Sequence, residues 1–115
     1  MKFLCLAYGD AKDWNALTSK EQQEMLAQDE ALRERGTLMA AVQTHVVKVR
    51  AWAGEPNATE GAFAQSGVPL AGFSIVDADD VDEVVQLVAG TPCARAKGWI
   101  EIRPILAIND YKLGS

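Results

Sequence analysis

Metal-binding side chains are scarce in this sequence. It has one histidine, His45, two cysteines, Cys5 and Cys93, and no Cys-x-x-Cys pair. Protein zinc and iron sites need several cysteine or histidine ligands, so we expect no metal centre, and the two cysteines are expected to be reduced thiols. Gly-x-Gly fingerprints, phosphate-binding loops and a Ser-His-Asp order are also missing, so no nucleotide cofactor is expected.

An excess of positive charge and long apolar runs are missing too. The 11 lysines and arginines are outnumbered by 16 aspartates and glutamates, for a net charge of −5. Nucleic-acid binding needs a basic surface, so we do not expect it. No apolar run approaches the roughly 20 residues of a membrane span. The apolar start at 1–8 is followed at once by Gly9-Asp10, so we predict a buried strand rather than a signal peptide, and a cytoplasmic protein.

The 115 residues fit one α+β domain, 1–115, with an ordinary hydrophobic share of 49%. Apolar runs and alternating patterns predict five strands, at 2–8, 37–43, 47–52, 70–76 and 99–105. Two helices are predicted between them, giving the order β-α-β-β-β-α-β. Without the extra strand and its long loop, the path is the ferredoxin-like βαββαβ arrangement.

A capping box marks the start of the first helix, where Thr18 is followed three residues later by Glu21. The helical spacing predicts that Met25, Ala31 and Leu32 face the core.

For the second helix we predict Asp79 as the cap and Asp82 at the capping-box position. Its predicted inner stripe consists of Val81, Val84, Val85 and Val88.

Two helices can cover only one face of the predicted sheet. The residues expected on the other face are Trp99, Glu101 and Arg103, joined by Lys48, Arg50 and Trp52. Because a half-apolar sheet face is hard to leave in water, we expect a second copy to cover it in a homodimer.

Residues 53–69 hold three glycines and two prolines and read as a long loop with room for a short strand. A loop of this length in a compact domain is more typical of a flap or binding loop than of a plain connector.

Three segments, 1–10, 72–83 and 98–105, resemble the first strand, the strand with its acidic helix start, and the closing strand of the YCII-related proteins, in particular the branch named for a DGPF motif. Where that branch has Asp-Gly-Pro-Phe, this chain has Glu60-Gly61-Ala62-Phe63. The charged residues that commonly follow in the branch are missing from 65–69.

The resemblance implies a dimeric ferredoxin-like α/β barrel with a pocket between sheet and loop. Some YCII-related proteins look like lyases that use a His–Asp pair, and DGPF proteins are often associated with alternative sigma factors. Most have no assigned activity.

His45 and Glu60 are the candidate catalytic residues. His45 is the only side chain whose ordinary pKa lies near neutrality, so it could act as a general base. Glu60 replaces the motif aspartate and could move protons beside an apolar wall. The alternatives are a turn histidine and a solvated loop acid. His45 also does not match the histidine position of the lyase-like relatives.

The candidate ligand-binding residues are Tyr8, Asp10, Arg50, Phe63 and Arg103. Tyr8 could offer its hydroxyl to a ligand, and Arg50 or Arg103 could hold a carboxylate through two hydrogen bonds. The alternative for Asp10 is a turn former, and for Arg103 an ion pair at a dimer interface.

Two functions follow. The first is a small-molecule pocket between the open sheet face and the 53–69 loop, possessing weak lyase or isomerase activity. The second is a non-catalytic binding or regulatory module linked to an alternative sigma factor.

Overall fold

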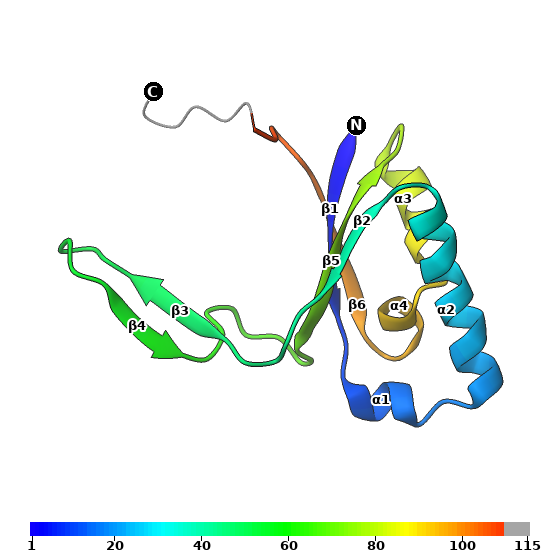
Figure 1. Ribbon diagram of the computed structural model, residues 1–115, viewed down its shortest axis with the longest axis horizontal. Helices are drawn as coiled ribbons and strands as arrows, with labels where there is room; N and C mark the ends of the chain where they lie inside the picture. The colour runs from blue at the N-terminus through cyan, green and yellow to red at the C-terminus, as the bar shows by residue number, and fades with distance from the viewer. Residues whose placement is uncertain (110–115) are drawn as a thin grey trace.

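A four-stranded antiparallel sheet forms the centre of the molecule in the computed structural model, which describes residues 1–109 (Figure 1). Its order is β2-β5-β1-β6. The strands are β1 (Lys2–Tyr8), β2 (Leu38–Ala41), β5 (Leu70–Asp77) and β6 (Trp99–Pro104). The mixed α+β class is confirmed, and the chain follows the predicted βαββαβ path through this sheet.

The apolar β1 run forms a central strand because it pairs on both sides, with β5 and with β6. Phe3 and Cys5 are almost fully buried and lie opposite Val76 and Ser74 of β5. These side chains point to the helices, so the core lies between that sheet face and the helix layer.

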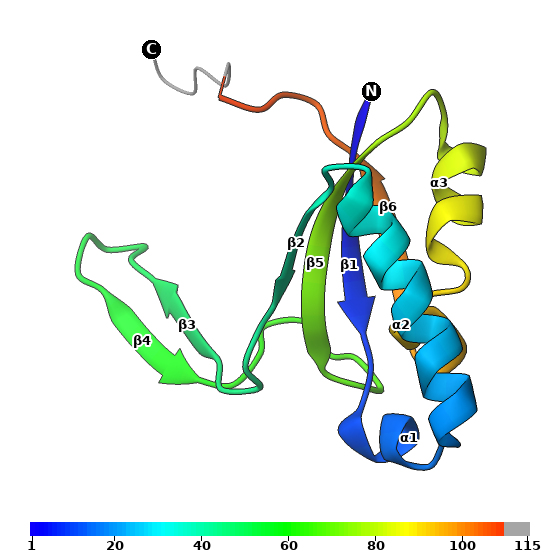
Figure 2. The same cartoon turned by 45° about the vertical axis from the view of Figure 1, so that its right-hand side comes forward.

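All the helices lie on one side of the sheet, as Figures 1 and 2 show. The longest is α2 (Ser19–Glu34), followed by α3 (Val81–Val88). The short helices α1 (Ala11–Asn15) and α4 (Pro92–Arg95) were not predicted, because single helical turns carry little periodicity. Within residues 1–109, no helix is both long and apolar enough to cross a bilayer.

The capping box of α2 is present as predicted. The Thr18 hydroxyl accepts a hydrogen bond from the Glu21 backbone N–H at 3.1 Å, and the Glu21 carboxylate accepts one from the Thr18 N–H at 3.0 Å. Both bonds hold the pKa of Glu21 below its usual value. The sequence therefore fixes the start of this helix locally.

For α3, the predicted cap was wrong by one residue. Asp80 is the N-cap, and its carboxylate accepts a hydrogen bond from the Glu83 N–H at 2.9 Å. Glu83 in turn accepts a bond from the Asp79 N–H at 3.1 Å. Four acids stand within five residues here, so several caps suit the local pattern, and Asp79 with Asp82 was the wrong choice.

The predicted inner stripes were too wide. Val84 and Val88 of α3 are buried, but Val81 and Val85 are 45% and 42% exposed. On α2, Met25 and Leu32 are buried and Ala31 is exposed. Each helix buries only a narrow line of residues because it packs on one sheet face without a further layer outside it.

A separate hairpin of β3 (Val47–Arg50) and β4 (Asn57–Glu60) stands away from the body, on the side opposite the helices (Figure 1). The predicted loop thus contains the short strand β4. Lys48, Arg50 and Trp52 lie on this hairpin and not on the main sheet, so that prediction was wrong. All residues in 41–67 are exposed. The radius of gyration is 16.3 Å, whereas a compact domain of this size has roughly 13 Å.

Candidate functional site

The sheet face opposite the helices is open and largely apolar. Side chains alternate along a strand, and Phe3 and Cys5 of β1 point to the helices. The alternate residues Leu4, Leu6 and Tyr8 therefore point to this face. The register adds Phe73 opposite Leu6, and Trp99 opposite Tyr8. Trp99 is 74% exposed. We refer to this surface as the open face.

A hollow of about 1030 Å³ lies where the open face meets the segments 42–46 and 60–70. Five of the seven predicted site residues line it: Tyr8, His45, Glu60, Phe63 and Arg103. They come from β1, the two ends of the hairpin, the segment after it, and β6. Residues up to 95 positions apart in the sequence therefore border one hollow.

His45 and Glu60 are brought to the same end of the hairpin by backbone pairing. Val47 lies opposite Glu60 in the β3–β4 register, and the Gly61 N–H donates to the Val46 carbonyl at 2.9 Å. Gly61 has a φ of 101°, a conformation that favours glycine. The glycine retained in the 60–63 segment is thus required by the turn that leaves β4.

The two remaining predicted site residues do not line the hollow. Asp10 is the N-cap of α1, and its carboxylate accepts a hydrogen bond from the Lys12 N–H at 3.1 Å. Arg50 is on the hairpin, where its guanidinium lies 4.5 Å from the ring centre of Trp52. Both side chains therefore have local structural partners.

The charged groups of the hollow include an ion pair on β6. Arg103 Nη2 lies 3.1 Å from Glu101 Oε1, and both side chains are about half exposed. Glu60 and Lys97 are the other charged lining residues. Lys48 does not line the hollow, and its ammonium donates to the Glu60 backbone carbonyl at 3.5 Å and not to the carboxylate. Positive and negative groups therefore stand along the same apolar hollow.

Among the lining residues that were not predicted as site residues, three from the end of the chain bring charge or an aromatic ring to the hollow: Lys97, Trp99 and Glu101. Trp99 and Glu101 were expected on the open face, where a role in the dimer interface was favoured over a role in a pocket. Lys97 has a φ of 63°. The sequence signal that could have marked Lys97 as a site residue is its position beside Gly98, directly before the last strand. Among residues 1–109, no group of three or more metal-ligating side chains occurs.

Comparison with known proteins identifies one family. Residues 1–109 match the family model described as the YCII-related domain, so the match includes the central sheet, the helices and the hairpin. No curated protein matches the chain.

Proposed function

The chain belongs to the YCII-related domain family, and we propose that it is a homodimeric protein that binds a small organic molecule in the hollow of the open face. The observation that carries the proposal is the convergence of Tyr8, His45, Glu60, Phe63 and Arg103 on this hollow. Apolar walls with a few polar groups are typical of small-molecule sites.

The size of the hollow supports closure by a second copy. Its volume of about 1030 Å³ is slightly above the roughly 300–1,000 Å³ that is typical of ligand pockets. In a single chain the hollow is bordered by exposed segments on one side. A partner chain seated on the open face reduces the space and removes the ligand from water.

Two exposed surfaces support the homodimer. Trp99 and Leu38 of the open face are 74% and 58% exposed, and Phe63 beside it is 90% exposed. Within residues 1–109, the strands of the hairpin contact mainly each other, and Val49 and Trp52 are 68% and 86% exposed. An isolated hairpin is at best marginally stable in water. A second copy related by a twofold axis covers both surfaces, in the dimeric α/β-barrel manner.

The proposed chemistry follows from the residue types. Arg103 binds a carboxylate of the ligand through two hydrogen bonds. The ligand carboxylate replaces the carboxylate of Glu101 as the partner of Arg103. His45 and Glu60 act as proton-transfer groups at the carbon next to a carbonyl, which is the reaction class of many isomerases and lyases. In this proposal the segment 60–63 is a variant of the DGPF motif, in which Glu60 supplies the carboxylate.

The proposal is tested with phenylpyruvate, which carries a carboxylate and an exchangeable proton beside a carbonyl. Binding is followed through the NMR signal of the Trp99 indole, and catalysis through deuterium exchange above the rate without protein. We expect Arg103→Gln to weaken binding about tenfold. The double variant His45→Ala/Glu60→Ala should keep binding and lose exchange. Arg33→Gln, on the helix side, is the matched control.

The outcomes separate the two parts of the proposal. Loss of exchange with retained binding supports the proton-transfer roles. Binding without exchange in the unmodified protein leaves a binding protein and removes the catalytic part. Phenylpyruvate and benzoate are the first two carboxylates to be tried. If no small carboxylate perturbs the Trp99 signal, the hollow is not a carboxylate site.

A second candidate is the non-catalytic module linked to an alternative sigma factor. The exposed hairpin favours it, because its Trp52 is 86% exposed in the single chain. If the hairpin covers a second copy, Trp52 fluorescence is shielded from acrylamide in the purified dimer. If Trp52 stays accessible in the dimer, the hairpin is free for another protein, and capture of a sigma factor becomes the experiment of choice.

A further inference from the structure

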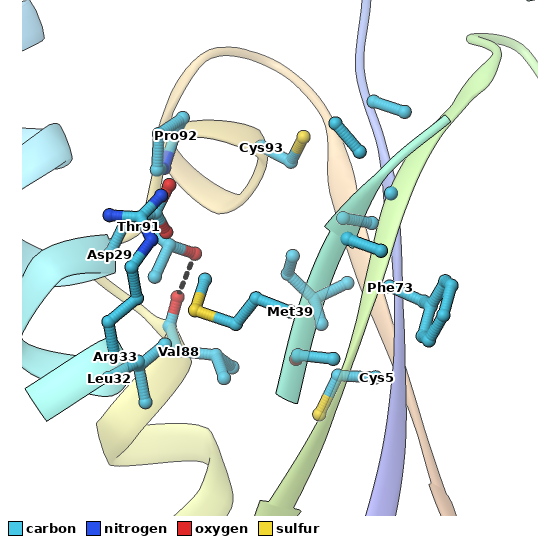
Figure 3. A pocket seen from close by; sticks show the side chains of 17 residues that line it. Cys5, Asp29, Leu32, Arg33, Met39, Phe73, Val88, Thr91, Pro92 and Cys93 are labelled. Carbon is cyan, nitrogen blue, oxygen red and sulfur yellow. Dashed lines mark hydrogen bonds between the residues drawn. The ribbon is translucent and has the colours of Figure 1, made fainter. Parts of the chain in front are cut away.

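A second cavity, of about 230 Å³, lies on the opposite side of the sheet from the hollow (Figure 3). It lies between α2 and α4 on one side and the sheet on the other, and it is partly open to solvent, since the lining residues Arg33 and Ala41 are exposed. In Figure 3, Met39 extends from β2 into this space, Cys93 points from α4 toward the sheet, and Phe73 points away to the open face. The cavity therefore belongs to the helix layer and is separate from the site proposed above.

Small residues explain why the chain leaves this space unfilled. Ala7 of β1, Ala41 of β2 and Gly72 of β5 meet at the cavity, and Ala7 and Ala41 are both register partners of Gly72. Protein interiors are normally packed as tightly as organic crystals. For comparison, an apolar cavity of about 150 Å³ in another protein accommodates benzene. The cavity here is large enough for a small ring or a short branched chain.

One carboxylate faces the cavity without a partner. Asp29 of α2 is half-buried at its wall, and it takes part in none of the hydrogen bonds or ion pairs found within residues 1–109. Arg33, one turn further along, pairs with Glu30 instead, at 2.8 Å. Burial raises the pKa of Asp29, and the nearby Arg33 charge opposes this shift. A desolvated carboxylate of this kind is stabilised by a bound cation.

The other polar groups around the cavity suit a donor rather than an anion. The Thr91 hydroxyl donates to the Val88 carbonyl at 2.6 Å, so its oxygen can still accept a bond from a ligand. Burial, and then the charge of Asp29, raise the pKa of the Cys93 thiol and keep it neutral. A ligand in the cavity thus meets two acceptors, Asp29 and Thr91, and an uncharged thiol. Arg33 also lines the cavity, but its guanidinium is already paired with Glu30.

We propose that this cavity binds a small primary amine. The ammonium group pairs with the Asp29 carboxylate and donates to Thr91, and the apolar body fills the space beside Ala7, Ala41 and Gly72. The unpaired charge of Asp29 identifies the ligand class. A carboxylate ligand would meet Asp29 with the same sign of charge, and the positive charge of Arg33 is already paired with Glu30.

Three probes of the same shape test the proposal: benzylamine, benzyl alcohol and benzoate. Binding is measured by NMR on the backbone amides of Ala41 and Cys93. We expect benzylamine to bind this cavity at least about tenfold more tightly than benzyl alcohol, and benzoate not to bind in it. Binding of benzoate to the hollow of the open face is distinguished by the Trp99 signal. Asp29→Asn should weaken benzylamine binding about tenfold. Glu24→Gln, which removes an exposed carboxylate from the same helix, should change nothing.

Two further measurements place the probe in the cavity. Ala41→Leu adds bulk on an edge strand and should abolish benzylamine binding. In the unmodified protein, bound benzylamine should slow alkylation of Cys93 by iodoacetamide, and this readout does not depend on the folding of any variant. Equal binding of benzoate and benzylamine, full binding by Asp29→Asn, or unprotected Cys93 at saturating benzylamine would each overturn the proposal.

Discussion

Lys2 and Asp77 face each other across β1 and β5, with Lys2 Nζ 2.6 Å from Asp77 Oδ2. The amino group of Met1 lies 3.7 Å from the other carboxylate oxygen. The hydrogen bond from Lys2, followed by the two positive charges, holds the pKa of Asp77 below its usual value of 3.8. The first and the seventy-seventh residues are thus linked at one edge of the core.

This pair predicts an acid-sensitive contribution to stability. A carboxyl group whose pKa is lowered on folding stabilises the folded state above its unfolded-state pKa, and this contribution is lost as the pH falls through the lowered, folded-state pKa. Asp77→Asn should therefore lower the melting temperature near neutral pH and flatten its decline in acid, over about pH 4 to 2. Melting curves at a series of pH values test this, with Glu24→Gln as the control. An unchanged acid decline in Asp77→Asn would show that the pair contributes nothing.

The cap of α3 predicts unequal effects of two neighbouring aspartates. Asp80→Ala removes the bond to the Glu83 N–H and should cost about 1 kcal/mol of the free energy of unfolding. Asp79→Ala keeps the backbone N–H that donates to Glu83. It should therefore lower the free energy of unfolding by only about 0.3 kcal/mol. Urea unfolding measures both variants. Equal losses would mean that the helix begins at a different residue.

A close backbone approach predicts that Gly98 tolerates no side chain. A Cβ added at Gly98 would lie 2.0 Å from the Tyr8 carbonyl oxygen and 2.6 Å from that of Cys93. Gly98→Ala should therefore lower the free energy of unfolding by more than about 2 kcal/mol, because backbone atoms have to move. At Gly67 nothing lies within 4 Å of such a Cβ. Gly67→Ala is the matched control and should stay within about 0.5 kcal/mol. Similar unfolding curves for the two variants would contradict the predicted clash.

The open face predicts the assembly state. Trp99→Glu places a charge at the centre of the proposed interface and should convert the dimer to single chains, with the helical circular dichroism signal unchanged. Leu26→Glu, which alters a 48% exposed residue of α2 on the helix side, should leave the dimer intact. Light scattering after size exclusion gives the mass. A single-chain mass for the unmodified protein would remove the homodimer from the proposal.

Local signals were the predictable part of the fold. Three local patterns were found in place: the β1 run, the Thr18–Glu21 capping box, and the alternation that puts Trp99, Glu101 and Arg103 on one face of β6. Each specifies structure through neighbours within a few residues. The α3 cap and the width of the helix stripes were missed because several residues satisfy the same local pattern. Packing on a single sheet face then selects among them.

The candidate site divides in the same way. The sequence was enough to choose the residue types able to move protons or hold a carboxylate. These are an imidazole, a carboxylate on a glycine turn and an arginine on the last strand. Asp10 and Arg50 were of suitable type but have partners elsewhere. The cavity near Asp29 had no sequence signal, because an empty space between α2, α4 and the sheet is a property of distant residues together.

The sequence by itself determined the α+β class, the order of the main strands and the start of α2, since hydrophobic period and capping act over a few neighbouring residues. Only the tertiary structure decided that β3 and β4 leave the sheet as a hairpin, and that Tyr8 and Arg103 border the same hollow as His45. Strand pairing joins residues that are far apart in the chain, and neither composition nor spacing records which strands will pair.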